Sequence, residues 1–182
     1  MKGTVRASER KLVSGLLILA ALVLGGLPTG IPEGMADSIT FTGVVVGIED
    51  GDTLTVLRNK ARFTLNVAGV DAPELDQPYG QQAKRLVAVL AMDQVVTVRI
   101  FVTGHQGRLT GEVWLKDRRN LANELVKAGL AWVKRGALVA VDFEQSETDA
   151  KEVQRGLWAD EEPVPPWEWR QGRRPMGVGA RP

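Results

Sequence analysis

Two short acidic segments carry the residues of this sequence that are best suited to chemistry. Residues 50–53 read Asp-Gly-Asp-Thr, and residues 71–74 read Asp-Ala-Pro-Glu directly after an apolar stretch. Two carboxylates held close together, such as those of Asp52 and Asp71, repel each other unless a positive charge lies between them. Oxygen ligands without nearby His or Cys favour a hard cation such as Ca²⁺. The alternative is ordinary turn chemistry, because Asp-Gly is a frequent hairpin turn.

The elements that must position these acids are mostly β-strands. Alternating apolar and polar residues and runs of β-branched residues predict five of them. They form a hairpin at 39–57 around an acidic turn at 49–52, and three further strands at 63–69, 95–102 and 109–115. Because the acidic segments lie at the ends of neighbouring strands, we expect those ends to bring the two aspartates together.

Apolar residues at helical spacing predict three amphipathic helices, at 81–92, 120–133 and 148–157. Short strands interleaved with helices, without long β-α-β crossovers, favour a small α+β barrel over a doubly wound sheet. We therefore expect one folded domain over residues 39–160, without internal repeats.

Residues 1–36 have the order of a secretory signal peptide. A basic segment precedes the uncharged apolar run at 12–27, and the small residues that follow suit a cleavage site after Ala36. The alternative is a retained membrane anchor, since a span needs roughly 20 apolar residues. In either case we expect the domain to be exported, to the periplasm or the cell exterior, and to be membrane-attached only if residues 12–27 are retained.

The charge balance excludes a globally basic nucleic-acid-binding protein. The chain of 182 residues has 23 Lys and Arg against 22 Asp and Glu, and residues 1–36 hold four of the basic and two of the acidic ones. The remaining 19 basic and 20 acidic residues leave the rest of the chain nearly neutral. A polyanion must therefore meet a local positive patch. Because the chain has no cysteine, the domain must rely on its core, its ion pairs or a bound ion.

The C-terminal segment 161–182 is rich in Pro, Trp and Arg. From Arg170 onward it lacks apolar periodicity, which predicts a mobile tail. Trp167 and Trp169 are expected to fold back onto the domain as an apolar clasp.

Taken in order, the motifs of this chain resemble those of the staphylococcal nuclease (thermonuclease) family. The likeness runs from about residue 43 to residue 158, with a family-like PPWEWR segment after it. The motifs are DGDT at 50–53, GVDAPE at 69–74, QPYG at 77–80, GR at 107–108, LVKAGLAW at 125–132 and GLW at 156–158. The resemblance implies an OB-fold, a five-stranded β-barrel with three helices, that carries a Ca²⁺-dependent phosphodiesterase site and acts on nucleic acid.

Carried over residue by residue, the resemblance implies a calcium site. The carboxylates of Asp52 and Asp71 and the main-chain oxygen of Ala72 match metal ligands of the family, and Asp50 matches an acid near the ion that does not ligate it directly. Glu74 matches the acid that orients or deprotonates the attacking water.

Arg108 matches one of the two arginines that bind the phosphate in the family. The other arginine lies five residues before Asp71, where this sequence has Asn66. Phosphodiester hydrolysis builds negative charge on the phosphate, so loss of one cationic donor typically costs about two to three orders of magnitude in rate. Arg62 is roughly 13 Å along the strand from position 66, which is too far for it to replace the missing arginine without rearrangement. Arg58 lies in a turn and would have to fold over the site.

The substrate-binding side also departs from the family. Where family members often have tyrosines near the bound nucleotide, this chain has Lys134 and Arg135. We expect these two residues to bind nucleic acid through its phosphates more than by stacking on bases.

The residues favour two classes of function. The first is an exported Ca²⁺-dependent nuclease that hydrolyses single-stranded DNA or RNA as a monomer, with activity reduced by Asn66. The alternative is a catalytically inactive barrel that binds nucleic acid, another polyanion or a protein. A phosphodiesterase with a different substrate is a third interpretation. Polyanion binding that survives chelation and Asp52→Ala would identify the binding module.

Overall fold

The computed structural model describes residues 39–103, 108–136 and 143–175. The predicted signal peptide or anchor at 1–36 lies outside these ranges. Among the described residues, none of the helices is both long enough and apolar enough to cross a bilayer.

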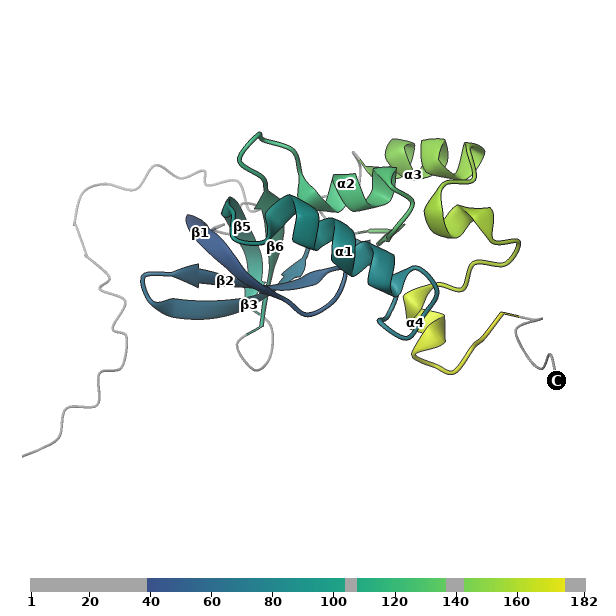
Figure 1. Cartoon of the computed structure of the whole chain (residues 1–182), viewed down its shortest axis with the longest axis horizontal. Helices are drawn as coiled ribbons and strands as arrows, with labels where there is room; N and C mark the ends of the chain where they lie inside the picture. The colour runs from purple at the N-terminus through teal and green to yellow at the C-terminus, as the bar shows by residue number, and fades with distance from the viewer. Residues whose placement is uncertain (1–38, 104–107, 137–142, 176–182) are drawn as a thin grey trace, which may run out of the picture. The chain divides into compact units, whose positions relative to one another are not determined.

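Five strands close into a barrel, as the sequence predicts, and their order is β1-β2-β3-β6-β5 (Figure 1). Adjacent strands are antiparallel except β3 and β6, whose parallel pairing completes the closure. The strands are β1 (Ile39–Ile48), β2 (Thr53–Arg58), β3 (Ala61–Val67), β5 (Val95–Thr103) and β6 (Leu109–Trp114). The architecture is the α+β barrel of an OB-fold.

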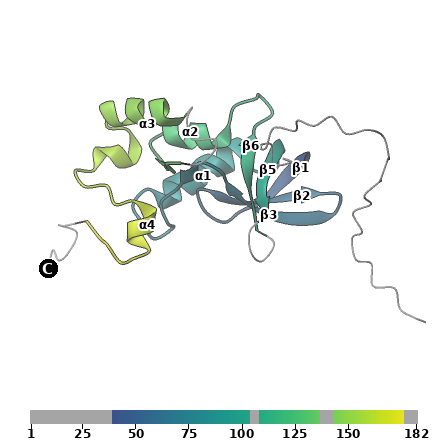
Figure 2. The same cartoon turned by 180° about the vertical axis from the view of Figure 1, so that it is seen from behind.

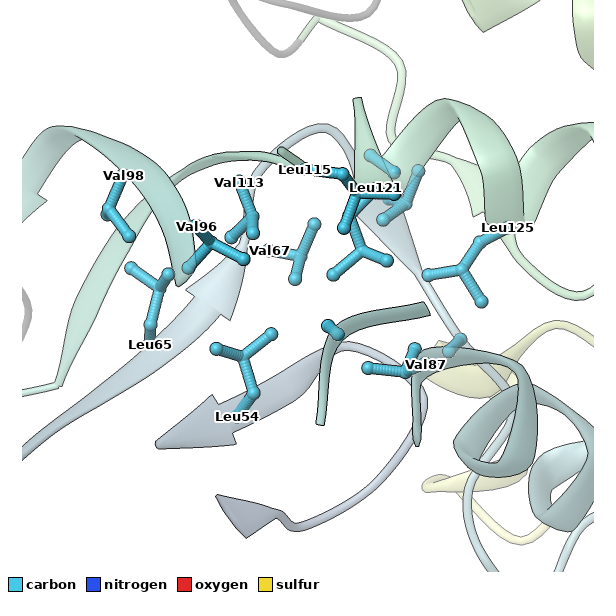
Figure 3. Close-up of a cluster of buried hydrophobic side chains, with 14 of the residues drawn as sticks. Leu54, Leu65, Val67, Val87, Val96, Val98, Val113, Leu115, Leu121 and Leu125 are labelled. Carbon is cyan, nitrogen blue, oxygen red and sulfur yellow. The ribbon is translucent and has the colours of Figure 1, made fainter. Parts of the chain in front are cut away.

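The core fills the barrel and continues under two helices (Figure 3). Leu54, Leu65 and Val98 project inward from three strands and are fully buried. Val87 of helix α1 (Gly80–Ala91) and Leu125 of helix α2 (Leu121–Lys127) extend this cluster outside the barrel. Each such side chain stabilises the fold by roughly 1.5–3 kcal/mol. Figures 1 and 2 show α1 and α2 lying beside the barrel.

The prediction of a helix at 120–133 is wrong for its second half. Helix α2 ends at Lys127, and Gly129 follows with φ of +64°. A Cβ on Gly129 would lie 2.0 Å from the main-chain oxygen of Arg155, so the chain turns away at this close contact. Trp132 and Val133 then form strand β7 (Trp132–Val133), which pairs with β4 (Val70–Asp71).

The helix predicted at 148–157 begins earlier and ends earlier. Helix α3 spans Phe143–Glu152, and a separate 3-10 helix η2 spans Gly156–Ala159. The buried face of α3 contains Phe143, Glu147 and Ala150, whereas Val153 is 60% exposed. The apolar pattern missed this face because its middle residue is a glutamate, whose carboxylate accepts the main-chain N–H of Val133 at 3.0 Å.

Residues 160–174, here called the C-terminal arm, are held against the domain. The buried Gln77 side chain donates to the Val164 carbonyl, and the Tyr79 hydroxyl lies 3.1 Å from an Asp160 carboxylate oxygen. The arm includes the short helix α4 (Pro166–Trp169), which the sequence analysis did not predict. The expected mobile tail from Arg170 is wrong as far as residue 174. The main-chain N–H groups of residues 170–173 bond back to carbonyls of residues 166–169, and the Arg174 side chain donates to the Trp169 carbonyl at 3.0 Å.

The expected tryptophan clasp is confirmed. The Trp169 indole N–H donates to Asp76 at 3.1 Å, and the Trp167 ring packs edge-on against Trp132 with 6.4 Å between centroids. Trp132 also packs edge-on against Trp158 at 5.4 Å. These contacts attach the arm to the side of the domain that carries the acidic segments.

Candidate active site

The turn between β1 and β2 is organised by one of its own acids. Asp50 Oδ1 accepts the main-chain N–H groups of Asp52 at 3.0 Å and Thr53 at 2.7 Å. This is the local side chain to backbone bonding that stabilises Asp turns. Asp50 therefore shapes the turn, and one of its carboxylate oxygens is committed to the backbone.

Close packing brings this turn to the second acidic segment. A Cβ on Gly51 would lie 2.6 Å from the Cβ atoms of both Ala72 and Ala83, so only glycine permits the approach. Asp52 Oδ2 accepts the main-chain N–H of Ala72 at 2.9 Å. The expectation that strand ends bring Asp52 and Asp71 together is thus confirmed.

The β4–β7 pair places a lysine beside Asp71. Asp71 is paired with Trp132, and the next backbone bond runs from the Lys134 N–H to the Gly69 oxygen at 2.9 Å. The Lys134 Nζ atom lies 3.9 Å from Asp71 Oδ2. Arg135 lies one residue further on and faces a different groove.

Glu74 is held in a compact turn before α1. Its main-chain N–H donates to the Gln77 side-chain oxygen at 3.1 Å, and its carbonyl accepts the Gln77 N–H at 2.9 Å. The carboxylate itself is partly exposed and lines a cavity, where its Oε1 atom accepts a hydrogen bond from Arg170 at 2.6 Å.

These segments surround one polar cavity of about 250 Å³. Asn66 lines it and is held by Thr53, whose hydroxyl donates to the Asn66 side-chain oxygen at 3.2 Å. Arg108 also lines it, and among the described residues it makes a long contact with Glu49, at 4.0 Å. The lining residues are Asp50, Asp52, Thr53, Asn66, Asp71, Ala72, Pro73, Glu74, Arg108, Lys134 and Arg170. Except for Arg135, the cavity contains every site residue that the sequence predicts.

Arg170 of the C-terminal arm is the residue that the sequence analysis missed. Its Nη1 atom lies 2.6 Å from Glu74 Oε1 and 3.3 Å from Asp71 Oδ1, and its Nη2 atom lies 2.9 Å from Asp71 Oδ2. The guanidinium therefore joins two of the predicted acids. The PPWEWR segment held the signal, because a proline at the start of a short helix and two tryptophans before the arginine indicate an ordered structure.

The carboxylates of the cavity repel one another and are stabilised by positive charge. Burial, reinforced by the charges of Asp50 and Asp71, raises the pKa of Asp52 from 3.8 to about 7, and the Ala72 hydrogen bond and Lys134 only partly offset this rise. The hydrogen bond to Asp71, together with that to Glu74, raises the pKa of Arg170, which stays fully charged. Arg170 thus supplies charge to Asp71 and Glu74.

The donor set fits a hard divalent cation. Asp52 and Asp71 contribute carboxylate oxygens to the same cavity, Ala72 lines it beside them, and a guanidinium already occupies a cation position on Asp71. Within the ranges that the structure describes, no three His, Cys, Asp or Glu side chains converge closely enough to hold a metal by themselves. The two carboxylates would therefore need further oxygen ligands, from the main chain or from water, to hold a hard cation.

A second groove, of about 420 Å³, shares Lys134 with this cavity. Arg135 and Lys151 line it together with the rings of Trp132, Trp158 and Trp167. The predicted nucleic-acid-binding pair thus divides between the two hollows, with Lys134 in both and Arg135 only in the second.

Comparison with known proteins agrees with the motifs and the barrel. The sequence profile described as staphylococcal nuclease homologue matches residues 64–160. The chain is 35% identical over 128 residues to an "Uncharacterized endonuclease" of Escherichia coli, covering 70% of this chain and 84% of that protein. It is 32% identical over 144 residues to the "Micrococcal nuclease" of Shigella flexneri, covering 74% and 83%, and 34% identical over 139 residues to "Protein ParB" of Escherichia coli, covering 71% and 78%. With the barrel topology, the acidic cavity and these relatives in agreement, the chain belongs to the staphylococcal nuclease homologue family.

Proposed function

We propose that this protein is an exported, Ca²⁺-dependent nuclease that hydrolyses phosphodiester bonds of single-stranded DNA or RNA as a monomer. The observation that carries the proposal is the single cavity in which Asp52, Asp71, Glu74 and Arg108 face one another. Relatives named as endonuclease and micrococcal nuclease support the reaction class. The apolar run at 12–27 supports export.

Asp52, Asp71 and the Ala72 carbonyl would hold the metal. When bound, Ca²⁺ would polarise a phosphate oxygen and stabilise the negative charge of the transition state. Asp50 would keep the turn in shape through its two main-chain hydrogen bonds, so that the Asp52 carboxylate stays directed at Ala72.

Glu74 would act on the attacking water. Its main chain is fixed by Gln77 and its Oε1 accepts from Arg170. Within the described contacts its Oε2 has no hydrogen-bond partner, so this oxygen can orient a water molecule and accept its proton. Arg108 would donate N–H groups to a phosphate oxygen, because its side chain lines the cavity and is 57% exposed. The leaving oxygen then takes a proton from solvent at this open cavity.

The experiment measures cleavage of single-stranded DNA by the full chain, with Ca²⁺ and with a chelator. We expect cleavage only with Ca²⁺, and a loss of about 10²–10⁴ in kcat for Glu74→Gln, the range for a removed general base. Glu152→Gln changes an exposed acid on α3 and should cleave like wild type.

Cleavage that persists in chelator, or full activity of Glu74→Gln, would overturn the proposal. If no variant cleaves while the chain still binds single-stranded DNA in chelator, the protein is a binding module. Asn66 is the observation that favours that alternative, because it lines the cavity and carries no charge where phosphate binding favours a cation.

A further inference from the structure

The cavity lacks a cation at the strand position next to its acids. Asn66 occupies that position on β3, and its side chain is engaged by Thr53. The arginines earlier along β2 and β3 do not compensate. Arg58 stacks on the Phe41 ring, 4.9 Å from its centroid, and neither it nor Arg62 is among the cavity-lining residues in the described ranges.

Arg170 reaches the same cavity from the opposite end of the chain. Its guanidinium lies against Asp71 and Glu74, and its side chain remains 49% exposed. Three of its five N–H donors are used in these contacts. Within the described contacts, the Nε–H and the second N–H of Nη2 remain for an acceptor that enters the cavity.

The C-terminal arm is attached to the domain by contacts that do not involve the Arg170 side chain. Trp169 is fixed by its indole bond to Asp76, and Trp167 packs on Trp132. The Arg170 main-chain N–H bonds to the Pro166 carbonyl at 2.9 Å, and Val164 is tied to Gln77. These contacts fix the backbone that carries Arg170, so its flexible side chain starts within reach of the cavity when a ligand enters.

The charges of the cavity leave a role for this third cation. Four carboxylates line it, those of Asp50, Asp52, Asp71 and Glu74, against the cations Arg108, Lys134 and Arg170. The net charge of the lining is therefore −1. A bound divalent ion changes it to +1, and a phosphodiester with one negative charge then makes the site neutral. Without Arg170, the loaded site would already be neutral and would bind the phosphate with a net negative charge.

We propose that Arg170 is the second phosphate-binding arginine of this site, supplied by the C-terminal arm in place of the arginine absent at Asn66. The proposal rests on the proposed function, since it assigns a residue to the same cavity. In the metal-free protein the guanidinium is kept on Asp71 and Glu74. In the loaded site it binds the phosphate while it retains its contact with Glu74.

The test measures binding of adenosine 3′,5′-bisphosphate to the full chain with Ca²⁺ by isothermal titration calorimetry. This probe carries phosphates but no diester bond to be cleaved. We expect Arg170→Gln to weaken binding at least tenfold, and Asn66→Arg in the Arg170→Gln background to restore part of the affinity. Arg173→Gln is the matched control, because Arg173 lies on the same arm, pairs with Glu168 and does not line the cavity; its affinity should stay within twofold of wild type.

A second titration, of Ca²⁺ alone, separates this role from simple blocking of the acids. If Arg170→Gln binds the bisphosphate as tightly as wild type or more tightly, the proposal is overturned, and tighter Ca²⁺ binding would then show that Arg170 only competes for the carboxylates. Failure of wild type to bind the bisphosphate also overturns it. Circular dichroism melting of each variant checks that the arm variants are folded.

Cleavage of single-stranded DNA by wild type distinguishes the two proposals. If wild type cleaves and Arg170→Gln both binds and cleaves equally well, the arginine assignment fails and the nuclease stands. If wild type binds the bisphosphate through Arg170 but cleaves nothing, the phosphate site stands and the nuclease fails.

Discussion

The acidic and the basic sides of the cavity are built in different ways. Asp52, Asp71 and Glu74 lie within a short stretch of chain, and main-chain hydrogen bonds fix each segment. The cations Arg108 and Arg170 come from segments far apart in the chain, and their side chains are 57% and 49% exposed. The acidic side is therefore rigid and preorganised, whereas the basic side can move toward a ligand.

This difference has a consequence for catalysis. A rigid carboxylate pair keeps two like charges close together and needs a cation, while exposed arginines can each bind a phosphate independently. Removing an acid should therefore stop the reaction, and removing a basic residue should reduce it stepwise.

The largest effect is expected from Asp71→Asn, which removes one carboxylate of the metal site and the main partner of Arg170. Loss of metal-ion catalysis is worth several kcal/mol, so cleavage of single-stranded DNA should fall by about 10²–10⁴. Steady-state cleavage assays at the Ca²⁺ concentration that saturates wild type measure it. A variant that is folded and retains wild-type activity would show that the rigid side does not hold the ion.

Arg108→Gln should have the next largest effect, a fall of about 10²–10³ in kcat with Ca²⁺ affinity unchanged. The reason is loss of one charged donor to the phosphate, with the acids intact. Arg85→Gln, on an exposed part of α1, is the control and should behave like wild type. Equal loss of Ca²⁺ binding and of kcat in Arg108→Gln would mean that Arg108 also affects the metal site, so that the acidic and basic sides do not act independently.

The rigid side also predicts a pH dependence of stability in metal-free buffer. Burial raises the pKa of Asp52 from 3.8 to about 7, so the folded protein loses stability as pH rises through this window, while the unfolded chain is already ionised. Asp52→Asn keeps an acceptor for Ala72 and should be more stable than wild type above pH 7, by on the order of 1–3 kcal/mol, with little gain near pH 4.

Urea unfolding of wild type and Asp52→Asn at pH 4 and at pH 8 measures the difference in their free energies of unfolding. A gain of equal size at pH 4 and pH 8 would show that Asp52 ionisation is not its cause.

The smallest effects are expected at the edge of the basic side. Lys134→Gln and Arg135→Gln should each weaken binding of single-stranded DNA modestly and reduce the slope of log affinity against log salt by about one or less. Fluorescence anisotropy over a range of salt concentrations measures both quantities. An unchanged slope in both variants would exclude phosphate contacts at these positions.

Much of the rigid side could be predicted from the sequence because its determinants are local. Strand alternation, the Asp-Gly turn and the acids after an apolar strand lie within about 25 residues of one another, and the barrel confirms them. Local patterns failed where distant contacts decide. Gly129 ends α2 because it meets Arg155, and Glu147 takes a buried position in α3 because it bonds to Val133.

Arg170 shows the same limit at the site itself. Its partner Asp71 lies 99 residues earlier in the chain, and the surrounding Arg, Gly and Pro composition is typical of a disordered tail. Only the position of the two tryptophans relative to Asp76 and Trp132 in the fold directs the guanidinium to the cavity.

Isothermal titration of the full wild-type chain with Ca²⁺, beside Asp71→Asn, tests most directly whether the rigid acidic side is a metal site. We expect one Ca²⁺ bound per chain by wild type and none detectable by the folded Asp71→Asn variant. Absence of binding by wild type, or equal binding by the variant, would contradict it.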